Sequence, residues 1–388
     1  MEQTRVVLKN RGAVRVRAGH PWIYRSDVAE AGGESGDVVL VFDRGGNLLG
    51  KGFYNPKSEI TLRMAERRDE PVDESWFRAR IREALAYRET LGIDSDAYRL
   101  LHAEADGVPG LVVDRYGEHL VLQVGSAAVE KRLDWIVDAL YELLAPAGVL
   151  LRGDSAARRW EGLDTAVRLL SGVVPESVIV REGPVRYRAH LWSGQKTGGF
   201  LDQRENRIAA GGYARGRVLE VFSYAGGFAL HSARRAETVE AVDSSGPALE
   251  AARANAQLND LANITFTRSN AFDLLRERSG AGEGYDMAIL DPPAFARTKR
   301  ELPKALRAYK EINLRAIKLL NPGGTLFTCS CSYHLSRELM EDTLRSAAAD
   351  AGRAMRVHEW RGQARDHPEV LTIPETSYLK CAVLERLS

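Results

Sequence analysis

The stretch GRVLEVFSYAGGFALHSARR, residues 216–235, decides the fold class. Within it, a short apolar run at 218–222 leads through a turn containing Gly226 and Gly227 into a helix-forming segment. Continuous apolar runs are typical of strands in a parallel sheet covered on both faces, and such sheets bind ligands in the loops beyond the strand ends. Because glycine has no side chain, we expect the backbone of this loop to approach a bound group closely. The stretch therefore predicts an α/β domain with a ligand site at the loop.

The next segment indicates which ligand the loop binds. Residues 239–243 form a second apolar run that ends in Asp243, about 20 residues after the loop, where a carboxylate can accept both hydroxyls of a ribose. Ser244, Ser245 and Pro247 then predict a helix start with a cap and a first-turn proline. The loop lacks the GxGxxG pattern of a pyrophosphate site, so a cofactor with adenosine but no diphosphate, such as S-adenosylmethionine, fits best. A structural glycine turn in another α/β protein is the alternative.

Length and composition predict a globular protein of two or three domains. The chain has 388 residues, of which 44% are hydrophobic and 28% are charged. No apolar stretch approaches the roughly 18 residues of a membrane span, and the start, MEQTRVVLKNRG, does not resemble a secretory signal. The three cysteines form no disulfide framework, which suits a reducing compartment. We therefore expect a cytoplasmic protein that does not bind membranes.

Positive charge is concentrated at the front of the chain. Residues 1–68 hold twelve Lys and Arg against eight Asp and Glu, a balance of +4 in a chain whose total is +1. Such an excess, with Arg11, Arg15 and Arg17 close together, is expected of a surface that contacts RNA phosphates. A solvated basic face without a partner is the alternative. Apolar runs separated by turn residues predict a small β domain here, with strands at 38–42, 48–54 and 60–64.

The middle of the chain carries fewer signals. A charged linker at 66–74 precedes a helix with Phe77, Ile81, Ala84 and Leu85 on one face. Residues 98–180 then combine strand-like runs with a single predicted helix at 129–144.

Residues 194–207, GQKTGGFLDQRENR, are more polar than a connector needs. One interpretation is a lid over the cofactor loop, formed by Gln195, Lys196, Asp202, Gln203 and Arg204. The other, which can hold at the same time, is a helix that starts at Asp202 with a capping partner, Glu205, three residues later.

A fourth predicted strand, 287–290, ends in Asp291-Pro292-Pro293-Ala294-Phe295. The prolines fix φ and lack an amide hydrogen, so the Asp291 carboxylate and the Pro292 carbonyl are held as acceptors. Together they can accept the exocyclic amino group of a base, and Phe295 can stack on its face. A merely stiff turn is the alternative, although the position at the ligand edge of the sheet favours function.

Cys331 lies just beyond a fifth predicted strand, 325–329. Cytosine C5 becomes nucleophilic enough to take a methyl group only after a thiolate adds at C6, which requires a cysteine with a lowered pKa near the methyl donor. Cys329, within the strand, is expected to be a buried small hydrophobe, and the same inert role is the alternative for Cys331. We expect no metal, because structural zinc needs four ligands and the remaining Cys381 has no paired partner.

Taken together, these residues resemble the RlmI-like large-subunit rRNA cytosine-5 methyltransferases. The resemblance covers almost the whole chain and rests on seven stretches in order: 19–22, 104–116, 194–207, 222–228, 291–295, 328–332 and 367–368. It implies an α/β fold with a Rossmann-like S-adenosylmethionine methyltransferase sheet at 185–388. It also implies an N-terminal β-rich PUA RNA-binding domain at 1–68 and a small α+β central domain at 73–182.

The resemblance further implies the roles of individual residues. Cys331 would be the nucleophile, Arg11, Arg15 and Arg17 would contact the RNA backbone, and the base would be faced by Asp291, Pro292, Pro293 and Phe295. The cofactor would be bound by Gln195, Lys196, Phe200, Asp202, Arg204, Phe222, Ser223, Tyr224, Asp243, Ser244, Asn270, Ala271 and Asp291. Asn270 departs from the family, which usually has Asp there, but its amide oxygen can still accept a hydrogen bond from adenine.

The sequence thus favours an enzyme that forms 5-methylcytosine in large-subunit (23S) rRNA, with S-adenosylmethionine as cofactor and a homodimer suggested by the family. A methyltransferase acting on an exocyclic base amine is the second hypothesis, because an Asp-Pro-Pro motif followed by an aromatic residue also occurs in such enzymes. A non-catalytic RNA-binding protein is the third.

Overall fold

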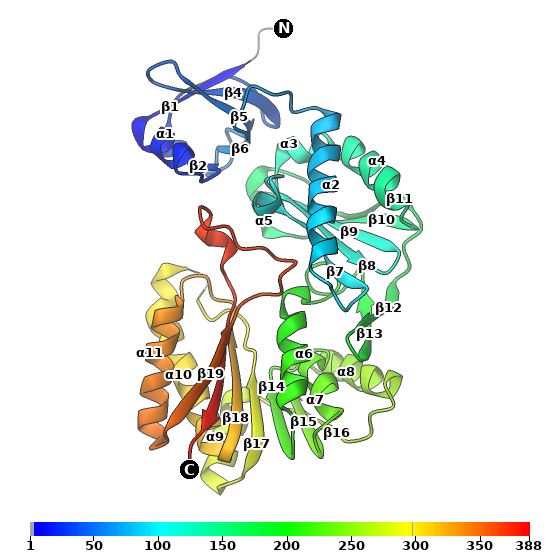
Figure 1. Cartoon of the computed structure of the whole chain (residues 1–388), viewed down its shortest axis with the longest axis vertical. Coiled ribbons are helices and arrows are strands. Elements are labelled where there is room, and N and C mark those ends of the chain that lie inside the picture. The colour runs from blue at the N-terminus through cyan, green and yellow to red at the C-terminus, as the bar shows by residue number, and fades with distance from the viewer. Residues whose placement is uncertain (1–3, 297) are drawn as a thin grey trace. The chain divides into compact units, whose positions relative to one another are not determined.

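The computed structural model describes residues 4–296 and 298–388, and its chain divides into two compact units (Figure 1). The first unit comprises residues 1–180, 189–201 and 365–376, and the second comprises 181–188, 202–364 and 377–388. Among the described residues, no helix combines the length and apolar character that a membrane crossing needs.

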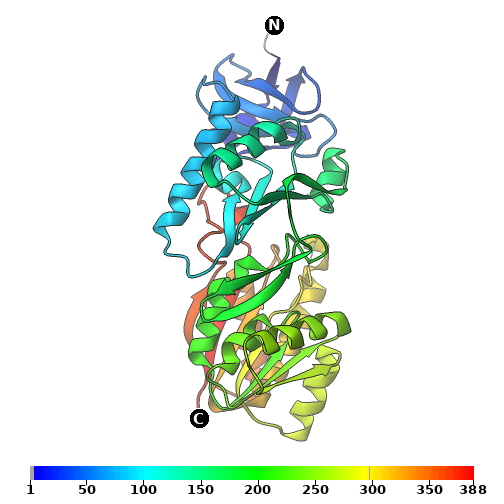
Figure 2. The ribbon, with the colours of Figure 1, turned by 90° about the vertical axis from the view of Figure 1, so that its right-hand side faces the viewer.

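A six-stranded sheet occupies the start of the first unit, in the order β2-β6-β5-β4-β1-β3 (Figure 2, blue). All its pairings are antiparallel except that of β1 with β4. The predicted β domain is therefore confirmed, and the predicted strands at 38–42 and 48–54 correspond to β4 and β5. The strands are β1 (Arg5–Leu8), β2 (Trp22–Ile23), β3 (Val28–Ala31), β4 (Asp37–Asp43), β5 (Leu48–Tyr54) and β6 (Leu62–Glu66).

One helix of this region, α1 (Asn10–Arg17), has no counterpart among the predicted elements. It carries Arg11, Arg15 and Arg17, whose neighbours Val14 and Val16 favour strands by propensity. The helix forms because Ala13 and Val16, three residues apart, are both buried against the sheet. Burial of one helix face has thus overridden the local propensity.

A five-stranded sheet follows, in the order β11-β10-β9-β8-β7. The long helix α2 (Glu74–Thr90) packs on it, and Asp73 caps this helix by accepting from Trp76 N. The helix predicted at 129–144 is confirmed over α4 (Leu133–Leu144), but its predicted start is wrong, because residues 129 and 130 belong to a separate short helix, α3 (Ala127–Glu130). The remaining elements are β7 (Ala97–His102), β8 (Leu111–Tyr116), β9 (His119–Val124), β10 (Gly148–Arg152), α5 (Ala156–Glu161) and β11 (Val167–Gly172).

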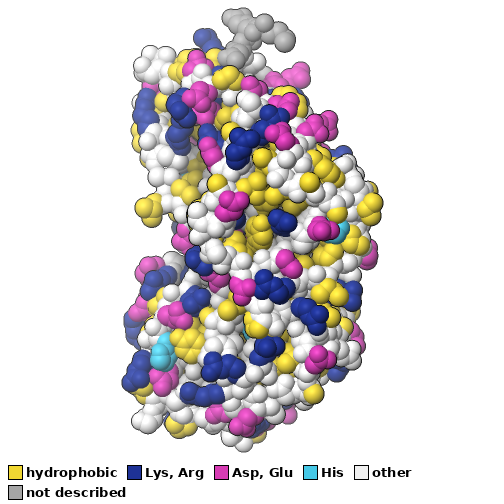
Figure 3. Space-filling model, turned by 45° about the vertical axis from the view of Figure 1, so that its right-hand side comes forward, with side chains coloured by type: hydrophobic (Ala, Val, Ile, Leu, Met, Phe, Trp, Pro, Cys, Tyr) yellow, Lys and Arg dark blue, Asp and Glu magenta, His cyan; other side chains and the backbone are white. Residues whose placement is uncertain are grey.

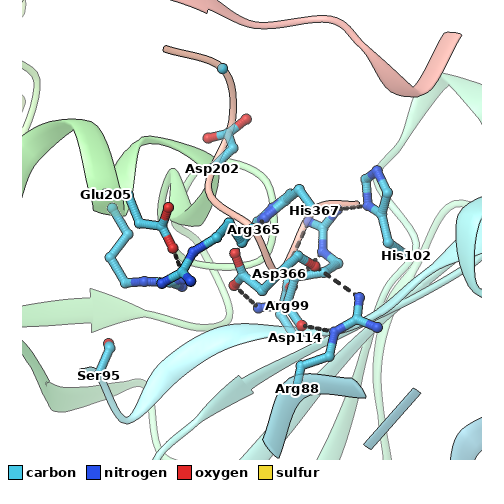
Figure 4. Close-up of polar contacts among 12 residues, drawn as sticks. Arg88, Ser95, Arg99, His102, Asp114, Asp202, Glu205, Arg365, Asp366 and His367 are labelled. Carbon is cyan, nitrogen blue, oxygen red and sulfur yellow. Dashed lines mark hydrogen bonds and ion pairs between the residues drawn. The ribbon is translucent and has the colours of Figure 1, made fainter. Parts of the chain in front are cut away.

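A buried ion-pair network in the first unit anchors its two later segments, 189–201 and 365–376 (Figure 4). Arg99 Nε donates to Asp114 Oδ1 at 2.6 Å, and Thr197 Oγ1 donates to the other oxygen of the same carboxylate at 2.6 Å. The backbone N–H of Arg99 donates to Asp366 Oδ2, and Arg88 donates to the Asp366 carbonyl, both at 2.8 Å. Asp114, which belongs to the resembling stretch 104–116, thus takes part in this anchoring.

The second unit is built on a seven-stranded sheet in the order β16-β15-β14-β17-β18-β20-β19. Its first five strands are parallel, and β20 is antiparallel to both of its neighbours. The strand order reverses direction at β14, so the switch point lies between β14 and β17. The strands are β14 (Arg217–Val221), β15 (Thr238–Asp243), β16 (Ile264–Arg268), β17 (Tyr285–Leu290), β18 (Leu320–Ser330), β19 (Met355–Arg361) and β20 (Lys380–Arg386). A separate hairpin pairs β12 (Ser177–Glu182) with β13 (Val185–His190).

Helices cover both faces of this sheet. Leu219 and Val221 contribute to one core together with residues of α9, α10 and α11, whereas Val218 contributes to the opposite core with α6, α7 and α8. Side chains along β14 therefore alternate between two buried faces, which explains its continuous apolar sequence. The helices are α6 (Arg204–Tyr213), α7 (Gly227–Ala233), α8 (Gly246–Leu258), α9 (Ala271–Ala281), α10 (Leu302–Leu319) and α11 (Arg337–Ala351).

Two predicted helix starts have different outcomes. Ser245 caps α8 by accepting from Ala248 N, and a proline occupies its first turn, as predicted. The start predicted at Asp202 is wrong, because α6 begins at Arg204 with no side-chain cap. The Asp202 carboxylate instead accepts from the Tyr378 hydroxyl at 3.0 Å, so it is oriented toward a distant strand connection rather than toward its own helix.

Candidate functional site

Four predicted site segments follow four adjacent parallel strands. The cofactor loop follows β14, Asp243 ends β15, Asp291 follows β17 and Cys331 follows β18. Because the carboxyl ends of parallel strands meet at one edge of a sheet, all four segments lie along the same edge, on both sides of the switch point. This is the arrangement in which open α/β sheets bind their ligands.

The loop after β14 has an unusual backbone. Phe222, Tyr224 and Gly226 all have positive φ angles, of 69°, 49° and 81°. Such a conformation is uncommon for a bulky side chain and costs on the order of 1–3 kcal/mol for a non-glycine residue. Strain of this kind is found where surrounding structure enforces a functional geometry, and nothing in the apolar pattern of residues 218–222 indicates it.

The two loop glycines, Gly226 and Gly227, pack closely against neighbouring helices. A Cβ on Gly226 would lie 3.1 Å from the Cβ of Ala252 on α8, and a Cβ on Gly227 would lie 2.6 Å from Cδ of Arg207 on α6. The space that their missing side chains leave is therefore filled by the neighbouring helices α8 and α6. The predicted close approach of the loop backbone to a bound group stays a prediction.

Asp243 lies at a cavity of about 100 Å³. Its Oδ2 accepts from Tyr224 N at 2.9 Å and its Oδ1 accepts from Ser245 N at 2.8 Å, which fixes the plane of the carboxylate. Each oxygen retains a lone pair that can accept a ribose hydroxyl. The cavity is lined by Phe222, Val242, Asp243, Ser244, Ser269, Asn270, Ala271 and Phe272, so the structure brings together five of the predicted cofactor residues.

Asn270 caps α9. Its Oδ1 accepts from the backbone N–H groups of Phe272 at 2.9 Å and Asp273 at 3.3 Å. Because this oxygen already serves two donors, the predicted hydrogen bond from adenine would have to compete with the cap. The amide NH2 group of Asn270 is the part of this side chain better suited to a ligand acceptor.

Two further groups test whether an adenosine cofactor fits this loop. The Ser223 hydroxyl is buried and has no hydrogen-bond partner among the described residues, as expected of a group that awaits a polar ligand. Burial raises the pKa of the Glu220 carboxyl to about 8, and the nearby Asp291 and Asp243 add to the shift against the opposing hydrogen bond from Ala229 N. Glu220 is therefore largely neutral at pH 7, which avoids a third negative charge beneath the loop. These features fit S-adenosylmethionine, which would bring its ribose to Asp243.

Asp291 is held by a residue of the polar segment. Gln203 Nε2 donates to Asp291 Oδ1 at 2.8 Å. Nearby, the Phe295 ring lies 4.8 Å from the Tyr309 ring and about equally far, 6.0 and 6.3 Å, from the cavity-lining Phe272 and Phe222. Phe295 thus connects the wall of the cofactor cavity to α10, and its predicted stacking on a base stays a prediction.

Cys331 is partly exposed, directly after β18, and its neighbours in sequence are tightly fixed. The Ser330 hydroxyl donates to the Tyr309 hydroxyl at 2.9 Å, and Ser332 Oγ lies 3.0 Å from the same hydroxyl. The ammonium of Lys380 donates to the Ser332 carbonyl at 2.9 Å. A nucleophile needs this combination of access and fixed backbone. An inert buried thiol, which was the alternative for Cys331, does not fit its exposure.

Cys329 behaves as predicted. It is fully buried and lies opposite Cys381 in the antiparallel pairing of β18 with β20. The hydrogen bond with Cys381 and burial both raise the pKa of the Cys329 thiol well above its usual value, so this sulfur stays protonated. No group of three or more His, Cys, Asp or Glu suited to hold a metal occurs within the described part of the chain.

Comparisons with known proteins agree with this geometry. Residues 6–67 match the PUA-like domain family, and residues 156–370 match the S-adenosylmethionine-dependent methyltransferase family. The ribosomal RNA large subunit methyltransferase I of Tolumonas auensis is 41% identical over 379 residues, which cover 95% of this chain and 96% of that protein. The corresponding protein of Klebsiella pneumoniae is 40% identical over 373 residues, 93% of each chain.

The chain belongs to the ribosomal RNA large subunit methyltransferase I family. Solved structures support the fold: a methyltransferase from Streptococcus mutans superposes with a TM-score of 0.83 at 19% identity, covering 98% of this chain and 99% of its own. The methyltransferase SMU.776, solved with S-adenosylhomocysteine, gives a TM-score of 0.85 with the same identity and coverage. The predicted family, α/β fold, PUA-like domain and S-adenosylmethionine dependence are therefore confirmed.

In this family member, several predicted cofactor residues are not among those that line the cavity. Asp202 and Arg204 are buried within the second unit, 4% and 1% exposed. Gln195, Lys196 and Phe200 belong to the first unit, where the Lys196 ammonium lies 4.7 Å from the centre of the Phe200 ring. Their predicted contacts with the cofactor, and the lid that they would form, stay predictions.

The three predicted RNA-binding arginines of this methyltransferase share two carboxylates. Arg11 and Arg15 both pair with the buried Asp27, and Arg17 pairs with Asp43, whose pKa is lowered to about 2, chiefly by hydrogen bonds from Asn47 and also by the Arg17 bond. The face drawn in Figure 3 shows Lys and Arg interspersed with Asp and Glu. Ion pairing therefore reduces the positive charge of α1 but leaves the Arg11 and Arg17 side chains more than half exposed.

Sequence analysis missed some residues that shape the methyltransferase site. Gln203 stood in the polar segment, but nothing in the sequence linked it to Asp291, and Lys380 and Tyr309 lie far along the chain from Cys331. A larger cavity, about 250 Å³, lies in the first unit between the β8–β9 hairpin and the end of α4, and it contains none of the predicted site residues. The smaller cavity at Asp243 is the one that the chemistry supports.

Proposed function

We propose that this methyltransferase forms 5-methylcytosine in large-subunit (23S) rRNA through a covalent adduct with Cys331. The substrate class follows from the relatives, which are named for methylation of large-subunit ribosomal RNA. The position of Cys331 carries the choice of reaction: it is a partly exposed thiol at the same sheet edge as the cofactor cavity, one residue beyond β18.

The reaction would proceed in three balanced steps. The Cys331 thiolate adds to cytosine C6, and the displaced electron pair makes C5 nucleophilic. Bound S-adenosylmethionine supplies an electrophilic sulfonium methyl group. The C5–methyl bond forms as that methyl leaves its sulfur. A base then removes the C5 proton, and the returning electron pair expels the thiolate from C6.

Residues of this chain would orient the base. Asp291, held by Gln203, would accept from the cytosine amino group, and the Pro292 carbonyl would offer a second acceptor. The fixed backbone around Cys331 would keep the sulfur at the distance needed for addition. The target base must leave its stack to reach this position, which is least costly in single-stranded RNA.

The test uses two cysteine variants. Purified protein is incubated with labelled S-adenosylmethionine and rRNA from cells lacking the enzyme, and the product nucleosides are separated. We expect 5-methylcytosine from the wild type, no product from C331A, and near wild-type product from C329A, whose thiol is buried. Full activity of C331A would contradict the thiol mechanism.

A second reaction, methylation of an exocyclic base amine, is supported by the Asp291-Pro292-Pro293-Ala294-Phe295 motif alone. It requires no cysteine, so the same experiment would give a methylated amine that persists in C331A. Membership in a methyltransferase family disfavours the third hypothesis, a non-catalytic RNA-binding protein.

Further parts of the proposal concern the setting of the reaction. The PUA-like region would hold the rRNA through Arg11, Arg15 and Arg17, so binding should weaken at high salt. On the basis of the family resemblance, we also propose that the protein is a cytoplasmic homodimer. A sedimentation-velocity experiment would measure the mass of the particle.

A further inference from the structure

A chain of side-chain hydrogen bonds connects the end of β19 to the Asp-Pro-Pro motif within the second unit. Arg361 Nε donates to Asn206 Oδ1 at 2.9 Å, and Asn206 Nδ2 donates to Gln203 Oε1 at 2.7 Å. Gln203 Nε2 then donates to Asp291 Oδ1 at 2.8 Å. Asn206 and Gln203 are 1% and 4% exposed, so water does not compete for these bonds.

The direction of this chain is fixed by its two ends. An arginine side chain can only donate, and a carboxylate can only accept. The two amides between them must therefore each accept on the Arg361 side and donate on the Asp291 side. Asn206 is further locked because its Nδ2 also donates to the Gly362 carbonyl at 3.0 Å. If the Asn206 amide were flipped, its oxygen would face two other acceptors, Gln203 Oε1 and the Gly362 carbonyl.

Arg361 is itself held in place. Its Nη1 donates to Glu359 Oε2 at 2.9 Å, and its Nη2 donates to the Glu205 carbonyl at 3.3 Å. The relay of Arg361, Asn206 and Gln203 therefore begins at a guanidinium with a fixed plane and ends at the carboxylate next to Pro292. Burial and the charge at either end strengthen its bonds relative to those between neutral groups at the surface.

We propose that Arg361, Asn206 and Gln203 are positioning residues that keep Asp291 ionised and turned toward the substrate base. This inference deepens the proposed function, on which it rests for the identity of the base. The relay presents an N–H group to one oxygen of Asp291, which fixes the plane of the carboxylate and so the direction in which it accepts an exocyclic amino group. A neutral or rotated Asp291 would lose that role.

The first test reverses the relay with N206D, which conserves shape. The new carboxylate at position 206 still accepts from Arg361 but offers an oxygen to Gln203 Oε1, so Gln203 must turn its own carbonyl toward Asp291. Asp291 then retains its proton to a higher pH. We expect the kcat of N206D to fall roughly tenfold or more at neutral pH, the value of one hydrogen bond to a charged group, and to recover as pH rises.

The second test, Q203E, should change the pH dependence of the activity in the opposite direction. The carboxyl group introduced at position 203 and that of Asp291 would then share one proton. While that proton is present, the introduced group donates to Asp291 as Gln203 does, so the activity is retained at low pH and declines as pH rises. For each variant, kcat is divided by the kcat of the wild type at the same pH. This ratio cancels every pH dependence that the variant shares with the wild type.

Two controls complete the design. Q257E makes the same amide-to-acid change at an exposed position of α8 and should give a ratio near one at every pH. Because neither residue lines the cofactor cavity, calorimetry should show that N206D and Q203E still bind S-adenosylhomocysteine, which shows that each variant is folded. If N206D does not bind S-adenosylhomocysteine, the relay is tested by Q203E alone, through the change of its kcat ratio with pH.

The two hypotheses fail separately. Total methyl transfer is counted for the pH ratios, whereas the identity of the methylated nucleoside is determined in a separate assay. A kcat ratio that rises with pH for N206D and falls with pH for Q203E supports the relay, whichever nucleoside forms. Flat ratios, or slopes of the same sign, overturn the relay even if the product is 5-methylcytosine.

Discussion

Replacing Glu182 by Gln should destabilise the second unit by removing the charge at the centre of a buried triad of side chains, Glu182 with Arg207 and His231. Arg207 Nε donates to Glu182 Oε1 at 2.7 Å, and His231 Nε2 lies 3.0 Å from the same oxygen. The Glu182 side chain is 1% exposed and the Arg207 side chain 10%. The triad joins β12, α6 and α7, and the Arg207 side chain also packs against Gly227, the first residue after the cofactor loop.

The magnitude follows from the pKa of the carboxyl group. Burial alone would raise the pKa of Glu182, but the charge and hydrogen bonds of Arg207, with a further bond from His231, lower it from 4.5 to about 2. At about 1.4 kcal/mol for each pKa unit, the ionised carboxylate contributes about 3 kcal/mol to the free energy of unfolding. The typical cost of breaking a buried ion pair, about 3–5 kcal/mol, is of the same order.

The lowered pKa also fixes the direction in which the Glu182 contribution to the free energy of unfolding changes with pH. Because the folded-state pKa is lowered, the contribution is fully present above the unfolded value of 4.5 and is lost as pH falls toward 2. Urea unfolding of the wild type and E182Q should therefore differ by about 3 kcal/mol at pH 7 and by less at about pH 3.5. A second effect should accompany this loss: weaker binding of S-adenosylhomocysteine, because α7 begins at the cofactor loop.

The matched control is E277Q, the same change at an exposed position of α9 with no ion pair among the described residues. We expect it to shift the free energy of unfolding by less than about 0.5 kcal/mol. The reasoning would be refuted if E182Q were no less stable than E277Q, or if the gap between E182Q and wild type were as large at about pH 3.5 as at pH 7.

Three further predictions concern the site itself. D243N should weaken S-adenosylhomocysteine binding roughly tenfold or more in calorimetry, because one amide oxygen cannot replace two carboxylate oxygens that each accept a backbone N–H. K380M should lower stability by about 2 kcal/mol in urea unfolding, because the buried Ser332 carbonyl and the Tyr378 carbonyl lose their charged donor. Y309F should reduce kcat while leaving the affinity for S-adenosylhomocysteine unchanged, because the Ser330 and Ser332 side chains on either side of Cys331 lose their hydrogen bonds to the Tyr309 hydroxyl, and Tyr309 does not line the cofactor cavity.

The sequence was most informative where strands are buried on both faces. The runs that predicted β14, β15, β17 and β18 are continuous because each strand packs into two cores. Once those strands are recognised, the residues after them must share one edge, so Asp243, Asp291 and Cys331 could be grouped before any coordinates existed. Parallel topology converts four separate motifs into one site.

Contacts between residues distant in the chain could not be predicted in this way. Arg361 and Asn206 are 155 positions apart, and Lys380 and Ser332 are 48 apart, yet each pair is hydrogen-bonded. Helix α1 was missed for a related reason, since its burial against the sheet rather than its composition makes it a helix. Local patterns predict which segments form strands, whereas the partners of buried polar side chains depend on the finished packing.

The spacing of the strands sets the scale of the proposed site within the second unit. Asp243 ends β15 and Cys331 follows β18, three strand positions along one edge, with the strained loop after β14 and Asp291 after β17 between them. At about 4.8 Å per strand, the ribose end and the nucleophile end of the site are about 14 Å apart. That span must hold the ribose, the sulfonium with its methyl group and one pyrimidine ring in line. Because these strands belong to one sheet with a helix-covered core on each face, the fold sets the distance between the proposed cofactor position at Asp243 and the proposed nucleophile Cys331. In the proposed reaction, the side chains between them would select and orient the base.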